Sequence, residues 1–150
     1  MSAYLAQESA IIDAPAGRIY EIIADYHEGH PAILPTRYFT DLKVVEGGQG
    51  VGTVIAVKMN VFGSKALLNL KVTKAEPGRL LVEEDEATGT MTTFSLEPLD
   101  DARTRVTIAT ETRTSPGLRG LVEKLMNPPI SRRIYREELQ KLAEVATHGQ

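Results

Sequence analysis

The strongest constraint on the fold of this chain is an alternation of apolar and polar residues that runs, with short interruptions, from Tyr38 to Arg113. Successive side chains of a β-strand point to opposite faces, so a period of two residues predicts strands with one buried and one solvated face. The interruptions are turn signals that suit hairpins: Gly63-Ser64, Glu76-Pro77-Gly78 and the turn around Thr88-Gly89. The region therefore predicts a meander of antiparallel strands with one buried face.

The turns also predict which residues share the buried face. A two-residue turn at Gly63-Ser64 places Val61 opposite Ala66, and the inward positions are then odd from 53 to 61 and even from 66 to 110. The opposite face of these strands carries lysines and asparagines, as expected for a solvated surface. The inward apolar residues expected to line a cavity are Val57, Met59, Leu68, Leu70, Val82, Phe94 and Ile108.

Glu84 is the exception on this inward face. In the predicted register it points inward between Leu70 and Thr92, with Thr110 next in the row. Burying a lone carboxylate would cost several kcal/mol or force it to take up a proton, so such a group needs partners. Two interpretations remain open. Either the strand ends or bulges near Glu84 and the acidic residues 83–86 are solvated, or the carboxylate belongs to a polar patch inside a cavity.

A strand and a helix are expected before the meander. Residues 3–12 read as a strand, and Asp13 or Ala14 then caps a helix with Pro15 in its first turn. The apolar stripe of this helix ends at His27, and the glycine and prolines that follow prevent a regular continuation. One helix, or one helix and a second short helical piece, is therefore expected before the meander.

A long helix is expected after the meander. Ser115 can cap it, and apolar residues keep helical spacing on both sides of Asn127-Pro128-Pro129, where a bend or a short break is predicted. The pattern resumes at Ile134. Met126 and Ile134 are expected to roof the cavity.

Two histidines stand close together in DYHEGHPAILP, the segment from Asp25 to Pro35. His27 and His30 miss the spacing of a helical zinc motif, and neither a third ligand nor an unbroken helix is evident, so no metal site is expected. The histidines are read as structural loop residues, with a role at the rim of the pocket as the alternative.

Composition excludes several function classes. The 150-residue chain has a net charge of −3 and no basic cluster, so neither nucleic acid nor an anionic membrane is an expected partner. It has no cysteine, no apolar run of the ~18 residues that span a bilayer and no basic leader, so a single cytoplasmic domain over residues 1–150 is expected. The loop GQGVG lacks a dinucleotide or P-loop pattern, and no cofactor is expected.

The chain resembles the SRPBCC superfamily, which includes START proteins, polyketide cyclases and birch-pollen allergens. The resemblance rests on IIDAPAGRIYEIIADY, EGGQGVGT, PGRLLVEED, TRVTIATE and the closing REELQKLAEVA. It implies an α+β helix-grip fold in the order strand, two helices, six strands and helix. In that fold a curved antiparallel sheet of about seven strands wraps a long C-terminal helix and leaves a hydrophobic cavity.

The resemblance leaves two functions open, because a shared fold does not settle activity. The preferred interpretation is binding of a medium-sized hydrophobic molecule, such as a lipid, a polyketide or an aromatic compound. The alternative is a cyclase or dehydratase in which Glu84 exchanges a proton with the substrate and His30 or Tyr38 assists. The candidate ligand-binding residues are Tyr38, Val57, Met59, Leu68, Leu70, Val82, Glu84, Thr92, Phe94, Ile108, Thr110, Met126 and Ile134.

Overall fold

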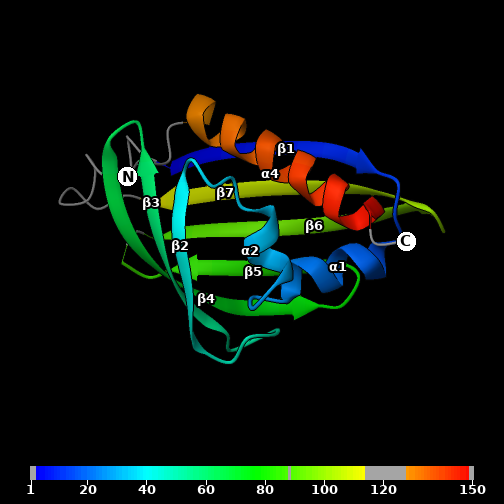
Figure 1. The fold of residues 1–150 in the computed structure, drawn as a ribbon, viewed down its shortest axis with the longest axis horizontal. Coiled ribbons are helices and arrows are strands. Elements are labelled where there is room, and N and C mark those ends of the chain that lie inside the picture. The colour runs from blue at the N-terminus through cyan, green and yellow to red at the C-terminus, as the bar shows by residue number, and fades with distance from the viewer. Residues whose placement is uncertain (1–2, 88, 114–127, 149–150) are drawn as a thin grey trace.

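The computed structural model describes residues 3–87, 89–113 and 128–148. They form one antiparallel sheet of seven strands in the order β1-β7-β6-β5-β4-β3-β2, with three helices (Figure 1). The strands are β1 (Ala3–Ile12), β2 (Phe39–Glu46), β3 (Val54–Val61), β4 (Ser64–Glu76), β5 (Leu80–Asp85), β6 (Thr90–Asp100) and β7 (Arg103–Arg113). The helices are α1 (Ala16–Ala24), α2 (Gly29–Ile33) and α4 (Pro128–His148). The predicted helix-grip fold is confirmed.

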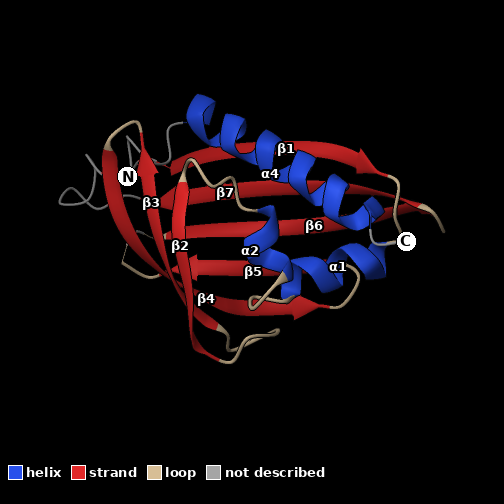
Figure 2. Ribbon diagram, viewed as in Figure 1, coloured by secondary structure: helices blue, strands red, loops and turns tan. Residues whose placement is uncertain are grey.

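The sheet is strongly curved, and the helices lie against its inner face. In Figure 2, β5, β6 and β7 run across the view while β2 and β3 stand nearly upright, so the sheet bends around the space that α4 covers. Helix α4 packs against β1, α1 and α2. The buried core therefore lies between the sheet and the helices. Within the described residues, no helix is long and apolar enough to cross a membrane.

The segment between α1 and α2 follows from a few local contacts. Helix α1 buries its apolar stripe and ends at Ala24, and the Asp25 carboxylate then accepts hydrogen bonds from the N–H groups of residues 27, 28 and 29. This side-chain turn redirects the chain into α2. At Gly29 a β-carbon would lie only 2.4 Å from the Ile22 carbonyl oxygen, so only glycine allows the two helices to approach this closely.

Helix α4 begins at Pro128, six residues before Ile134, where the sequence predicts that the helical pattern of apolar residues resumes. A proline is tolerated there because the first turn of a helix has no intrahelical acceptor for its missing N–H. Ile134, Tyr135, Leu139 and Leu142 are buried, in agreement with the predicted stripe. The helix expected from Ser115 and the residue Met126 lie outside the described residues, as does the first position of the predicted bend.

The hairpin between β3 and β4 differs from the predicted register. Val61 pairs with Ser64, and the turn is formed by Phe62 and Gly63, which both have positive φ angles of 49° and 87°. The prediction that Val61 lies opposite Ala66 is therefore wrong. Because the shift is an even number of residues, the buried faces of both strands stay as predicted.

Strand β5 shows the more important difference. Val72 pairs with Glu83 and Lys74 with Val82, so Thr73 is an extra residue in β4 that forms a bulge. This one-residue insertion reverses the faces of β5 relative to the prediction. Leu81 and Glu83 point inward, whereas Val82, which is absent from the main core cluster, and Glu84 lie on the outer face. The inward placement of Val82 and Glu84 was wrong.

Candidate functional site

A row of polar residues crosses the inner face of three neighbouring strands. Glu83 on β5 pairs with Thr92 on β6, and Thr92 pairs with Thr110 on β7. The two threonine hydroxyls are 2.9 Å apart, and the Thr110 hydroxyl forms a further hydrogen bond with the Tyr135 hydroxyl of α4. The row therefore connects the sheet to the closing helix through hydrogen bonds.

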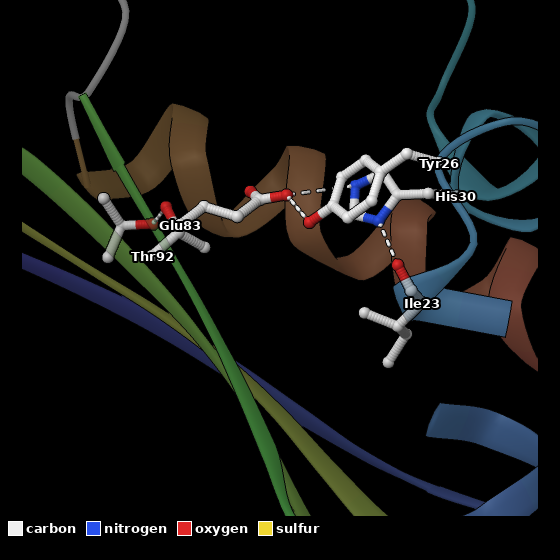
Figure 3. Close-up of polar contacts among 6 residues, drawn as sticks. Ile23, Tyr26, His30, Glu83 and Thr92 are labelled. Atoms are coloured by element: carbon white, nitrogen blue, oxygen red, sulfur yellow. Dashed lines mark hydrogen bonds and ion pairs between the residues drawn. The ribbon is translucent and has the colours of Figure 1, made fainter. Parts of the chain in front are cut away.

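The Glu83 carboxylate is buried, with 5% of the residue exposed. Its Oε2 atom accepts a hydrogen bond from the hydroxyl of Tyr26, which follows α1 and is fully buried, and lies 3.5 Å from His30 Nε2 of α2 (Figure 3). Burial, followed by the negative charge of Glu83, raises the pKa of the Tyr26 hydroxyl well above its ordinary value. Tyr26 is therefore a stable hydrogen-bond donor to the carboxylate.

His30 is held in one orientation by three contacts. Its Nδ1 atom is 2.8 Å from the Ile23 carbonyl oxygen, and its ring stacks on Tyr26 with centroids 4.3 Å apart (Figure 3). The Phe94 ring makes an edge-to-face contact with it, with centroids 5.6 Å apart. A carbonyl only accepts, so Nδ1 carries the proton that it donates and Nε2 faces Glu83. Nε2 and Oε2 then face each other at 3.5 Å, a contact that is an ion pair when the imidazole is protonated.

A second carboxyl group lies on the helix side of the site. Glu138 of α4 is 3% exposed, and burial, together with the neighbouring Glu83 carboxylate, raises its pKa well above the ordinary value. Burial likewise raises the pKa of Tyr135, one turn earlier on the same helix. Both shifts favour the uncharged form of the side chain.

His30, Glu83 and Glu138 line a cavity of about 70 Å³ between the sheet, α2 and α4. A single water needs roughly 10–15 Å³ by the same measure, so the space holds several waters or a small organic group. No lysine or arginine is among the lining residues that the structure describes. The cavity is lined by His30, Leu34, Phe39, Leu42, Ile55, Val57, Met59, Leu68, Leu70, Glu83, Thr90, Thr92, Phe94, Ser131, Ile134, Tyr135 and Glu138.

The structure places the candidate residues from the sequence in three groups. Those that line the cavity are His30, Val57, Met59, Leu68, Leu70, Thr92, Phe94 and Ile134. Tyr38, Ile108 and Thr110 are buried but are not part of the cavity wall, and the Tyr38 ring instead contacts Arg37 and Phe62. Val82 and Glu84 lie on the outer face of β5, and Met126 is outside the described residues.

Sequence reasoning missed Glu83 and Glu138, the two buried carboxyls of the site. Glu83 was missed because the bulge at Thr73 was not anticipated. Glu138 carried a usable signal, since it lies four residues after Ile134 and three after Tyr135 and so shares their buried helix face. Among the described residues, no group of three or more His, Asp or Glu side chains is arranged to hold a metal ion.

The chain belongs to the family described as polyketide cyclase / dehydrase and lipid transport, whose model matches residues 5–147. This membership confirms the resemblance to the SRPBCC superfamily drawn from the sequence. It supports ligand binding or a cyclase role without specifying the ligand or the mechanism. No curated protein is significantly similar in sequence.

Solved structures share the fold over nearly the whole chain. The solution structure of KanY has a TM-score of 0.81 and 28% identity, covering 97% of this chain and 99% of that one. Zhui aromatase/cyclase from Streptomyces sp. R1128 has a TM-score of 0.77 and 19% identity, with 97% and 94% covered. Norcoclaurine synthase from Thalictrum flavum, in complex with dopamine and hydroxybenzaldehyde, has a TM-score of 0.75 and 16% identity, with 99% and 89% covered.

Proposed function

We propose that this protein binds a medium-sized hydrophobic molecule, such as a lipid, a polyketide or an aromatic compound, in the cavity between the sheet and α4. The observation that carries the proposal is an internal cavity with mainly apolar walls and a few convergent polar groups. This is the usual composition of a small-molecule site, in which apolar area supplies affinity and polar groups orient the ligand. The family description, which includes lipid transport, supports the same reading.

The size of the cavity adds a condition to this proposal. Pockets for drug-sized ligands typically enclose ~300–1,000 Å³, whereas this cavity measures about 70 Å³. A medium-sized ligand therefore has to displace cavity side chains when it binds. The half-buried Leu68 and Leu70, on the strongly curved part of the sheet, are the apolar wall residues that we expect to move.

Native mass spectrometry of protein purified from its own host tests this proposal. We expect a retained small molecule on the wild type and on Leu67→Trp, because Leu67 lies on the outer face of β4 and is 59% exposed. Leu68→Trp, one residue along the same strand, places its indole in the cavity and should release the molecule. Equal retention by the two variants, or an unliganded wild type, would count against binding in this cavity.

The pair formed by Glu83 and His30 favours a second candidate function, a cyclase or dehydratase. Both reactions require a base that removes a proton next to a carbonyl group and an acid that returns one to oxygen. The pair places a carboxylate oxygen and an imidazole nitrogen 3.5 Å apart at the cavity wall, two groups that can exchange protons with a bound substrate, and the Ile23 carbonyl orients the imidazole. Glu83 thus takes the acid/base role expected of Glu84, and Tyr38 has no part because it lies outside the cavity wall.

Deuterium incorporation from D₂O into the molecule retained by the protein measures this proton transfer. Glu83→Gln keeps the size of the side chain and an acceptor for Tyr26, but it cannot take up a proton. We expect the exchange rate to fall by about 100-fold or more in this variant, with retention of the molecule unchanged. Equal exchange rates would remove the enzyme proposal and leave the binding proposal intact.

A further inference from the structure

Glu138 of the cavity wall lacks the hydrogen bonds that Glu83 and Tyr135 have. Glu83 is bonded to Tyr26 and contacts His30, and Tyr135 is bonded to Thr110. Glu138 also lines the cavity and is 3% exposed. Within residues 3–87, 89–113 and 128–148, however, no hydrogen bond or ion pair reaches its carboxyl group. Its polar atoms therefore face the interior of the cavity without a protein partner.

The position of Glu138 on α4 is well defined. Ser131, Ile134, Tyr135 and Glu138 all line the cavity, and their spacing of three to four residues places them on one face of the helix. The flanking turns are anchored, because Tyr135 is bonded to the sheet and Leu139 and Leu142 are buried. The carboxyl group is therefore presented to the cavity by a rigid element.

The charge balance of the cavity favours an uncharged Glu138. Glu83 lies across the same cavity, and no lysine or arginine is among the described lining residues. A second buried carboxylate would have no cation to offset its desolvation, and burial raises the pKa of Glu138. A protonated carboxyl group has one O–H donor and can also accept, so it suits a ligand that offers an oxygen acceptor.

We propose that Glu138 binds the ligand directly, by donating a hydrogen bond from its carboxyl group to a carbonyl oxygen of an uncharged, largely apolar molecule. This inference rests on the proposed ligand binding in the cavity and specifies the class of ligand. A ketone, ester, amide or quinone would satisfy the Glu138 donor. A free carboxylate or phosphate would lie between two carboxyl groups without a lysine or arginine from the described wall, so the site rejects anions.

Three small probes of similar shape test this preference: acetophenone has a carbonyl oxygen, ethylbenzene has none, and benzoate is an anion. NMR titrations at pH 7 measure the dissociation constant of each probe. For each protein, the dissociation constant of ethylbenzene is divided by that of acetophenone. We expect Glu138→Leu to lower this ratio about fivefold to tenfold, the contribution of one neutral hydrogen bond. Glu138→Gln should keep the ratio, because its amide N–H donates. Benzoate should bind the wild type at least tenfold more weakly than acetophenone does.

Glu144→Leu is the matched control, because Glu144 is an exposed glutamate on the same helix. The ratio of the two dissociation constants should be the same for this variant as for the wild type. An unchanged ratio in Glu138→Leu, with both neutral probes still bound, would overturn the role of Glu138 while supporting the cavity as a binding site. Benzoate binding as tight as that of acetophenone would also overturn it. If neither neutral probe bound the wild type, the proposed binding function would fall together with this inference.

Discussion

Two adjacent rows on the inner face of the same three strands have opposite chemistry. The apolar row consists of Leu81, Phe94 and Ile108, and the neighbouring polar row, two residues away on each strand, consists of Glu83, Thr92 and Thr110. Every member of the apolar row is at most 2% exposed and belongs to the main core cluster. The polar row instead makes specific hydrogen bonds to residues from α4 and from the segment after α1. The boundary between the hydrophobic core and the site therefore crosses β5, β6 and β7 between these two rows.

The two rows differ in what they require of their surroundings. Apolar contacts have no preferred direction, so the apolar row needs only close packing. Each buried hydrogen-bonding group of the polar row needs a partner in the right place, and removing one partner leaves the other unsatisfied. The polar row thus depends on the position of helices α2 and α4 in a way that the apolar row does not.

The largest loss of stability is expected from a substitution in the apolar row. Ile108→Ala removes three carbons from a side chain with no exposed surface, and we expect the free energy of unfolding to fall by about 3 kcal/mol. Urea unfolding followed by circular dichroism measures it. Glu111→Ala, at an exposed position of the same strand, should change stability by less than about 0.5 kcal/mol. Similar losses in both variants would contradict the assignment of faces on β7.

An intermediate effect is expected at Glu83 in the polar row. Glu83→Leu leaves the Tyr26 hydroxyl without its acceptor and removes the carboxylate beside His30, and unsatisfied buried groups cost about 1–3 kcal/mol. Glu83→Gln retains an oxygen acceptor and should lose less than half as much. Thermal and urea unfolding of the two variants compare them. If Glu83→Leu were the more stable of the two, the carboxyl group would not be part of a required hydrogen-bond network.

A pH-dependent effect is expected from Glu138. Its pKa is raised in the folded protein, so folding favours its protonated form. That contribution is complete below the ordinary value of 4.5 and is lost as the pH rises toward the folded value. Above that ordinary value, the wild type should lose stability relative to Glu138→Gln, by up to about 1.4 kcal/mol per pH unit.

Urea unfolding of both proteins at several pH values between 4 and 7 measures this difference. The titratable groups that face the same space, Glu83 from β5, His30 from α2 and Tyr135 on α4, are present in both proteins, so their contributions largely cancel. Tyr26, bonded to Glu83, is likewise common to both. Parallel stability profiles would show that the Glu138 carboxyl group is ordinary in its protonation and is in contact with solvent.

The comparison of rows also shows how far the sequence predicts this fold. Alternation predicted the inner faces of β3, β6 and β7, because each carries large apolar side chains on one side and polar ones on the other. It failed on β5 because the end of β4, from Thr73 to Glu76, is polar or small on both faces. No apolar residue there indicates the register, so a bulge at Thr73 has no local signature.

The site was predicted in part for the same reason. Thr92 and its neighbours on β6 follow from alternation alone, and they line the cavity. The partners of Glu83 come from α2 and the segment before it, about fifty residues away in sequence, and no local pattern pairs Tyr26 or His30 with a particular carboxylate. Tyr26 lies at the end of the apolar stripe of the first helix, and the sequence pattern does not indicate a partner for its hydroxyl.

The smallest change in stability is expected at Glu84, and this variant tests the assignment of the inner and outer faces of β5 most directly. Glu84 is next to Glu83 in sequence, but it lies on the outer face of β5, opposite Lys71 of β4, and is only partly buried. Glu84→Gln should therefore change the free energy of unfolding by less than about 0.5 kcal/mol, as is usual for surface substitutions. It should also leave deuterium incorporation into the retained molecule unchanged, whereas Glu83→Gln reduces it.

The two variants make the same chemical change at adjacent positions, so only the face on which each side chain lies separates them. A loss of exchange in Glu84→Gln with normal exchange in Glu83→Gln would mean that β5 has the opposite faces inward and that the polar row is wrongly assigned.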